Sequence, residues 1–266
     1  MVGYRIGFIG AGNMASAILN GALRHSVILP ENVYLSDPYI EKTDLFRVKG
    51  VHTTVSNTEV ADSVGILILA VKPQMFETVL SELKGHVEGK CVVSIAAGIS
   101  VDYIKKYLPN THVIRVMPNT PLLIGKGMTA IADAPDVPAS YVDAVTELFG
   151  AAGETVVVEE EKINAVIALS GSSPAYFFRF AAAMVSEGEK MGLSPETALN
   201  LAAYTMKGSA GMLLRSGKTP KELTDQVCSP GGTTLAALSA FDDAGLDTIV
   251  AEAMQRCVKR AEELGK

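Results

Sequence analysis

A glycine-rich turn near the N-terminus constrains the fold of this chain more than any other feature. The turn Gly10-Ala11-Gly12-Asn13-Met14-Ala15 follows the apolar run 6–9 and opens a helical pattern over residues 14–24. In a strand–turn–helix unit the first glycine permits the tight bend, the second lets the backbone approach a pyrophosphate, and a small sixth residue lets the helix pack closely on the strand. The turn therefore predicts a dinucleotide site, although the same glycines also occur in purely structural turns.

The N-terminal part of the chain alternates short apolar runs with helical patterns. Several of the runs are apolar at consecutive positions, which is typical of parallel strands that are covered on both faces. This rhythm predicts an α/β fold built on a Rossmann doubly wound, mainly parallel sheet. The expected strands are 5–9, 33–35, 65–71, 91–95, 112–117, 129–132 and 155–158, and the expected helices between them are 14–24, 40–48, 75–83, 101–108 and 139–149.

After about residue 161 the pattern changes to helices that are separated by glycine and proline. Ser194-Pro195 supplies an N-cap followed by proline at the first helical position, and Thr219 and Glu222 have the spacing of a capping box. We therefore expect a second, all-α domain. The predicted division is an NAD(P)-binding Rossmann domain over residues 1–162 and a helical substrate-binding and dimerisation domain over residues 163–266.

The expected helix over residues 175–191 is apolar on nearly every side. Such a helix has to be buried on more than one side. A domain of about a hundred residues has limited means to cover it alone. The pattern therefore predicts an obligate homodimer.

Further candidate cofactor residues stand at the ends of expected strands, because ligands of open α/β sheets bind beyond the carboxyl ends of the strands. Asp37, which follows Ser36, is placed to accept hydrogen bonds from an adenine ribose; the alternative is a turn aspartate before proline. Ala70-Val71-Lys72-Pro73 ends another strand, and Lys72 is equally well explained as a solvent-facing lysine without a catalytic role. Ala97 and Gly98 are small enough to leave room for a nicotinamide ring.

Composition excludes several classes of function. The net charge of −6 gives no basic surface for nucleic acid. The three cysteines and four histidines show no metal-ligand spacing, and the glutamates at 159–161 are best explained as a solvated helix cap. The longest apolar run, 64–71, is far shorter than the roughly 20 residues of a membrane span. Because no signal-peptide pattern is present, we expect a cytoplasmic protein whose ligands are small molecules.

One segment carries a family resemblance. Val227-Cys228-Ser229-Pro230-Gly231-Gly232-Thr233-Thr234 resembles the signature of the pyrroline-5-carboxylate reductase family, and the likeness continues through residues 235–242. Upstream, the glycine-rich turn, Ala70-Val71-Lys72-Pro73, Met117-Pro118-Asn119-Thr120-Pro121 and Leu169-Ser170-Gly171-Ser172 are also similar to this family. The resemblance covers essentially the whole chain in the right order.

The resemblance implies reduction of 1-pyrroline-5-carboxylate to proline, the last step of proline biosynthesis. It implies an interlocked dimer and further association into decamers. It also implies that Gly10 to Met14, Asn57, Ala70 to Pro73 and Ala97 contact the cofactor. Ser229 to Thr234 would hold the substrate, with Thr234 as the candidate catalytic residue and Ser172 as a further substrate contact.

The residue chemistry agrees with this family. Gly231-Gly232-Thr233-Thr234 stands at the expected start of a helix, where free N–H groups and two hydroxyls form a carboxylate receptor. The alternative is an ordinary threonine-capped helix start. Ketone reduction usually needs a Lys, His or Tyr acid, yet the second domain contains no histidine and its lysines stand in polar contexts. A cyclic imine can bind already protonated, so the absence fits imine reduction.

The chain departs from the family pattern at Ser173, where glycine is common, and serine loses backbone freedom if that position needs positive φ. A β-hydroxyacid dehydrogenase is the nearest rival, but it needs a catalytic lysine near the start of the helical domain and residues 164–175 contain none. A non-catalytic NAD(P)-sensing regulator would not need the carboxylate loop. The resemblance favours NADP as cofactor, whereas Asp37 argues that NAD is also used; Lys42, Arg47 and Asn57 are placed to compensate for its charge.

Overall fold

The computed structural model describes residues 2–265 and divides into two compact units. The sheet unit comprises the described parts of Met1–Pro174 and Arg256–Lys266, and the helical unit comprises Ala175–Gln255. The end of the last helix joins the sheet unit because Ala261 is buried there against Met117 and Ile163. The units differ in extent from the domains 1–162 and 163–266, and that division stays a prediction.

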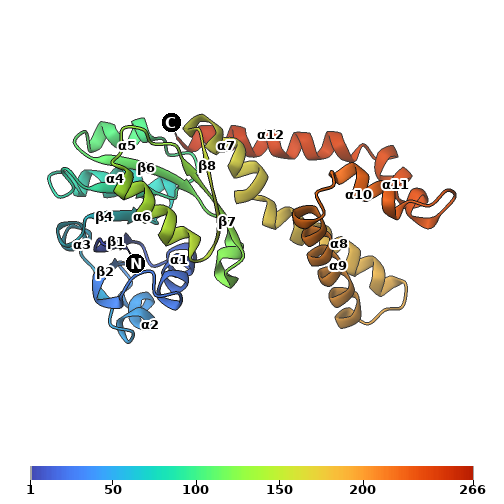
Figure 1. Cartoon of the computed structure of the whole chain (residues 1–266), viewed down its shortest axis with the longest axis horizontal. Helices are drawn as coiled ribbons and strands as arrows, with labels where there is room; N and C mark the ends of the chain where they lie inside the picture. The colour runs from blue at the N-terminus through green and yellow to red at the C-terminus, as the bar shows by residue number, and fades with distance from the viewer. Residues whose placement is uncertain (1, 266) are drawn as a thin grey trace. The chain divides into compact units, whose positions relative to one another are not determined.

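The sheet unit is a doubly wound α/β layer with helices on both faces (Figure 1). Its eight strands run in the order β3-β2-β1-β4-β5-β6-β7-β8, all neighbours being parallel except the antiparallel pair β6 and β7. The strands are β1 Ile6–Ile9, β2 Val33–Ser36, β3 His52–Thr54, β4 Ile66–Leu69, β5 Cys91–Ser94, β6 His112–Met117, β7 Gly127–Ala132 and β8 Gly153–Val158. The helices are α1 Asn13–Arg24, α2 Asp44–Arg47, α3 Asn57–Ser63, α4 Phe76–Glu82, α5 Val101–Tyr107, α6 Ala139–Gly150 and α7 Ile163–Val166, the last followed by a π-helical turn, Ile167–Gly171. The predicted fold class is confirmed.

Alternate residues of the central strands pack into two separate cores. Phe8 and Ile68 belong to the core under α1 and α6, whereas Leu67 and Leu69 belong to the core under α3, α4 and α5. The four side chains of β4 are all fully buried. Consecutive apolar residues are therefore required, as the sequence pattern indicated.

Three elements of the sheet unit differ from the prediction, and one of them, the helix α3, was not expected at all. The sheet contains a strand that was not predicted, β3 at His52–Thr54, because its polar, partly exposed residues at the edge of the sheet give no apolar run. The helix expected over residues 40–48 is a 3-10 turn, Ile40–Thr43, followed by α2. The buried Thr43 hydroxyl donates a hydrogen bond to the carbonyl oxygen of Ile40 at 2.7 Å, and such local bonds compete with a regular helix.

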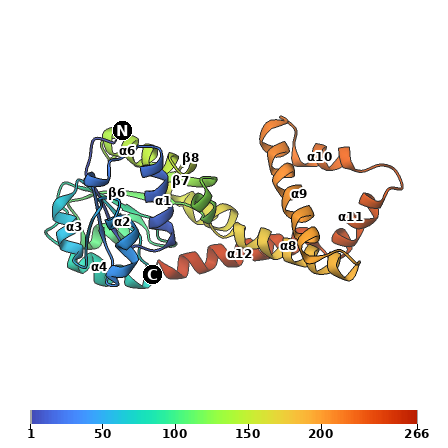
Figure 2. The same cartoon turned by 90° about the horizontal axis from the view of Figure 1, so that it is seen from below.

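The helical unit is built from α8 Ser173–Lys190, α9 Pro195–Arg215, α10 Pro220–Val227, α11 Thr233–Asp243 and α12 Leu246–Leu264, of which α8 begins and α12 ends in the sheet unit (Figure 2). The two predicted caps are confirmed. The Ser194 side chain accepts from the Thr197 N–H, and Thr219 and Glu222 form a reciprocal capping box. No helix among the described residues is long and apolar enough to cross a membrane.

Large apolar side chains of α8 lie open to solvent in the single chain. Phe177 and Phe178 are 58% and 69% exposed, and Phe180 and Met184 are also exposed. Contiguous apolar surface on a soluble protein marks an interaction site. The sequence predicts that this helix is buried on more than one side, and in the single chain its apolar side chains are exposed.

One buried hydroxyl offers a test of the core. Thr129 on β7 is 1% exposed, and its Oγ1 has no hydrogen-bond partner among the described residues. A buried unsatisfied polar group costs about 1–3 kcal/mol. We expect Thr129→Val to raise the free energy of unfolding by about 1 kcal/mol, measured by urea denaturation.

Thr111→Val is the matched control, because the buried Thr111 hydroxyl donates to the Leu108 carbonyl oxygen at 2.7 Å. This control should lower stability by about 1 kcal/mol. If both variants lost the same stability, the Thr129 hydroxyl would have a hydrogen-bond partner.

Candidate active site

The glycine-rich turn joins the carboxyl ends of β1, β2 and β4. Gly10 has φ +95°, and a Cβ there would lie 2.8 Å from the Ala70 carbonyl oxygen, so the turn requires glycine. The Gly10 N–H donates to the Ser36 carbonyl oxygen at 2.8 Å. Because the strand order reverses between β2 and β4 on either side of β1, this turn lies at the switch point where such sheets bind ligands.

The start of α1 is open for an anion. Gly12 occupies the N-cap position without a side-chain cap, and a Cβ on it would meet nothing within 4 Å. The first turn, which begins with Asn13 and Met14, contains no acidic residue. Uncapped N–H groups and the helix dipole favour a negative group at this position. These residues therefore fit a dinucleotide pyrophosphate.

Asp37 follows β2 and is almost completely buried, at 6% exposed. Its Oδ2 accepts the Ala11 N–H and its Oδ1 accepts the Tyr39 N–H, both at 3.0 Å. The Lys42 ammonium lies 3.5 Å from Oδ1. The carboxylate is thus fixed against the glycine-rich turn rather than extended into solvent.

Ser36 and Asn57 lie beside Asp37 and are joined by a hydrogen bond. The buried Ser36 hydroxyl donates to the Asn57 side-chain oxygen at 2.7 Å, and the Asn57 amide nitrogen donates to Glu82 at 2.9 Å. Glu82 was not predicted from the sequence, because nothing in its 25-residue separation from Asn57 indicates a contact. The pair of bonds fixes the orientation of the Asn57 amide.

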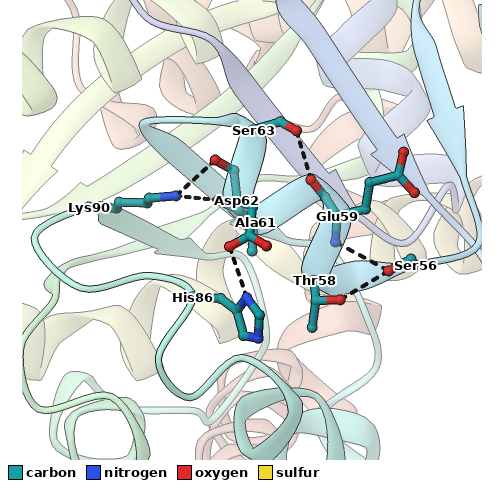
Figure 3. Close-up of polar contacts among 8 residues, drawn as sticks. All are labelled: Ser56, Thr58, Glu59, Ala61, Asp62, Ser63, His86 and Lys90. Atoms are coloured by element: carbon teal, nitrogen blue, oxygen red, sulfur yellow. Dashed lines mark hydrogen bonds and ion pairs between the residues drawn. The ribbon is translucent and has the colours of Figure 1, made fainter.

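Helix α3, which begins at Asn57, is anchored at both ends (Figure 3). The Ser56 hydroxyl accepts the Glu59 N–H at 3.2 Å. At the other end, the Lys90 ammonium donates to two carbonyl oxygens at 2.6 and 3.3 Å, and His86 Nδ1 lies 2.8 Å from the Asp62 carboxylate. A cation at the C-terminal carbonyls stabilises a helix. These contacts fix α3, whose first residue, Asn57, is a candidate cofactor residue.

The carboxyl ends of β4 and β5 carry the remaining candidate cofactor residues. Ala70 to Pro73 follow β4, and Ala97 and Gly98 follow β5. Gly98 has φ +83°, and a Cβ there would overlap the Ala261 carbonyl oxygen and lie 3.0 Å from the Leu264 Cβ. The loop after β5 and the end of α12 are therefore in direct backbone contact.

An ion pair between the buried Arg115 and the partly exposed Glu160 supports the same loop. Glu160 Oε1 accepts the Val101 N–H at 2.9 Å and lies 3.7 Å from the Arg115 guanidinium, which also donates to Asn164 at 2.8 Å. Burial lowers the pKa of Arg115, and the charge of Glu160 acts in the opposite direction. Glu160 therefore links β6 to α5, and its interpretation as a solvated cap was wrong. No sequence signal joins residues so far apart.

Ser172 follows the π-helical turn in the sheet unit. Its Oγ accepts a hydrogen bond from the Cys257 thiol at 3.3 Å. The turn itself is held by Asn119, whose amide nitrogen donates to the Ser170 hydroxyl at 3.1 Å. Ser173 begins α8 and has no positive φ, since Ser26 is the one non-glycine residue with positive φ in the described part of the chain. Serine at that position therefore causes no backbone strain.

The predicted carboxylate loop lies in the helical unit at the start of α11. Gly231 has φ +69°, and Gly232 occupies the N-cap position without a side-chain cap. A Cβ on Gly232 would overlap the Ser229 hydroxyl, so this glycine allows the loop to fold onto the helix. Thr233 and Thr234 form the first turn, which contains no acidic residue. The helix start is free to receive an anion.

The candidate residues form two groups. The cofactor candidates lie at the carboxyl ends of β1, β2, β4 and β5 and at Asn57, the first residue of α3. Ser172, a substrate candidate, belongs to the same unit. Ser229 to Thr234 gather in the helical unit. The roles of all these residues stay predictions.

Two family models match the chain, one over its N-terminal part and one over its C-terminal part. Residues 5–98 match the family described as NADP oxidoreductase coenzyme F420-dependent, and residues 160–264 match pyrroline-5-carboxylate reductase dimerisation. Fold and site thus define an NAD(P)H-dependent oxidoreductase that forms oligomers through a helical domain. A pyrroline-5-carboxylate reductase of Methanosarcina acetivorans is 38% identical over 100% of both chains. The chain belongs to the pyrroline-5-carboxylate reductase family.

Solved structures are similar over the full length. A pyrroline-5-carboxylate reductase from Coxiella burnetii has a TM-score of 0.89 at 34% identity, covering 98% of each chain. A Plasmodium falciparum pyrroline carboxylate reductase with NADP bound has a TM-score of 0.92 at 28% identity, covering 100% of each chain. The fold of both units is therefore that of the family.

Proposed function

We propose that the chain reduces 1-pyrroline-5-carboxylate to L-proline with NAD(P)H, the final step of proline biosynthesis. The observation that carries the proposal is the loop Ser229 to Thr234, which ends at the uncapped start of α11. The full-length relatives named pyrroline-5-carboxylate reductase support it. An open helix N-terminus with two adjacent hydroxyls suits a carboxylate. A nucleotide sensor does not require that loop, and a β-hydroxyacid dehydrogenase needs a catalytic lysine that residues 164–175 lack. The full-length relatives favour neither alternative.

The reduced nicotinamide supplies the hydride when it is bound. In the proposed mechanism, the amides at the start of α1 bind the pyrophosphate, while the small side chain of Ala97 leaves space for the ring. The Thr233 and Thr234 end of the loop binds the substrate carboxylate. Because the cyclic imine binds already protonated, its carbon accepts the hydride without a strong acid from the chain. Positioning then carries most of the catalysis.

The test mixes the purified full chain with synthetic 1-pyrroline-5-carboxylate and follows the absorbance of the reduced nicotinamide cofactor. We expect loss of reduced cofactor together with formation of proline. Turnover of a β-hydroxyacid instead would establish the dehydrogenase alternative. Cofactor binding without turnover of either substrate would establish the sensor.

Both cofactors are expected to serve. The fixed carboxylate of Asp37 favours the free 2′-hydroxyl of NADH, whereas the nearby Lys42 and Asn57 can interact with a 2′-phosphate. We propose that NADH is used at least comparably to NADPH. Values of kcat/KM for the two cofactors, measured at saturating imine, decide this point.

The assembly is proposed to be an obligate homodimer, with further association into decamers. The dimerisation match over residues 160–264 and the exposed phenylalanines of α8 support it. We expect sedimentation at micromolar concentration to give no monomer, because the isolated chain would leave this apolar surface in water. A stable, active monomer would contradict the proposal. We also propose a cytoplasmic location and the two domains 1–162 and 163–266.

A further inference from the structure

We propose that Lys42 is the residue that allows this site to accept the 2′-phosphate of NADPH next to the carboxylate of Asp37. The inference rests on the proposed function for its cofactor, and it adds a specificity-determining residue to that site. At the end of the second Rossmann strand an acidic residue binds a free ribose 2′-hydroxyl, whereas a nearby cation accommodates a 2′-phosphate. This chain has an acidic residue, Asp37, and a cation, Lys42, side by side at the end of that strand.

The carboxylate cannot turn away from the ribose position at low cost. Both oxygens of Asp37 accept backbone N–H groups, from Ala11 in the glycine-rich turn and from Tyr39. The side chain is only 8% exposed. Rotating it out would leave the buried Ala11 N–H without its acceptor, which is costly. The negative charge of Asp37 is therefore a fixed part of the site.

Lys42 is placed to offset this charge. Its ammonium lies 3.5 Å from Asp37 Oδ1 and 4.5 Å from the centre of the Tyr39 ring. The lysine side chain is 50% exposed, so its ammonium has donors left for a second anion on the solvent side. The Lys42–Asp37 pair has no net charge. A phosphate that approaches from solvent meets the exposed ammonium before the buried carboxylate, so it is attracted rather than repelled.

The neighbouring cations already have other partners. Arg47 on α2 donates to the Asp44 carboxylate at 2.8 Å, and Lys49 donates to the Asn20 side chain at 2.8 Å. Either residue would have to give up its bond to bind a phosphate. Lys49→Met is therefore the matched control, since it removes a neighbouring positive charge that donates to Asn20 and not to Asp37.

Asp37→Asn is a less clean variant. An asparagine has one acceptor oxygen, and it would direct its NH₂ group at one of the two backbone N–H donors that Asp37 now binds. The glycine-rich turn would loosen, and both cofactors would bind less tightly. Lys42→Met keeps the apolar stem over Tyr39 and removes only the charge.

The experiment measures binding of two cofactor fragments to the full chain by titration calorimetry. Adenosine 2′,5′-bisphosphate carries the 2′-phosphate, and adenosine 5′-monophosphate carries the free hydroxyl. For Lys42→Met we expect at least about tenfold weaker binding of the bisphosphate and less than about twofold change for the monophosphate. Lys42→Arg should keep the binding of the bisphosphate, and Lys49→Met should change the binding of neither fragment.

Equal weakening of both fragments in Lys42→Met, or weakening of neither, would overturn the assignment of Lys42. The ratio of kcat/KM for NADPH and NADH should fall in parallel with the fragment data. Fragment binding does not depend on the imine. A chain that discriminates the fragments as expected but reduces no pyrroline-5-carboxylate would therefore disprove the proposed reaction and leave the role of Lys42 intact.

Discussion

Gly98→Ala is expected to destabilise the protein by about 2–4 kcal/mol and to lower its Tm by about 5 °C or more. Two costs combine at this position. The backbone has φ +83°, which an L-residue adopts at a cost of about 1–2 kcal/mol. The new Cβ would also overlap the Ala261 carbonyl oxygen, and that oxygen belongs to the backbone of α12 and cannot rotate away.

Gly85→Ala separates the two costs. Gly85 has φ +81°, nearly the same value, but a Cβ there would meet nothing within 4 Å. We expect this control to lose about 1 kcal/mol, from the backbone conformation alone. Thermal denaturation of both variants gives the difference, which measures the contact between the loop after β5 and α12. If the two variants lost the same stability, that contact would be absent in solution.

The sequence predicted the parts of the fold that depend on local pattern. The apolar run at residues 66–69 is a fully buried central strand, and Gly10 stands where a side chain would strike the Ala70 carbonyl. Burial on both faces requires apolar side chains at residues 66–69, and the positive φ at Gly10 requires glycine. Strand β3 could not be found in this way, because its polar residues pair only at an edge.

Helix α3 was missed for a different reason. A usable signal was present, since Ser56 and Glu59 have the spacing of an N-cap and its third helical residue, and the bond between them forms. The helix has only seven residues, so its apolar periodicity is too short to recognise. In a crossover helix this short, the N-cap is a stronger sequence signal than apolar periodicity.

The side-chain contacts of the site could not be predicted at all. The position of Asp37 at a strand end is visible in the sequence, but the direction of its carboxylate toward the Ala11 N–H is a property of the folded turn. The Glu160–Arg115 pair likewise joins residues on separate elements. Sequence spacing locates groups on elements, whereas tertiary packing decides which groups meet.

Thr234→Val is expected to lower kcat/KM for the imine by roughly tenfold to over a hundredfold, with cofactor binding almost unchanged. The substitution keeps the shape of the side chain and removes the hydroxyl that we propose to hold the substrate carboxylate. One lost hydrogen bond to a charged group is worth about 1.5–3 kcal/mol, which corresponds to that range of rates. Steady-state kinetics with varied imine and a separate cofactor titration measure the two effects.

Two variants control for a purely structural effect. Thr234→Ser keeps a hydroxyl at the first turn of α11 and should recover most of the activity. Thr224→Val makes the same substitution on α10, where the hydroxyl donates only to the Pro220 carbonyl oxygen at 3.0 Å, and should leave kcat/KM within about twofold. A Thr234→Val enzyme that bound cofactor poorly but used the imine normally would move the substrate site away from the start of α11.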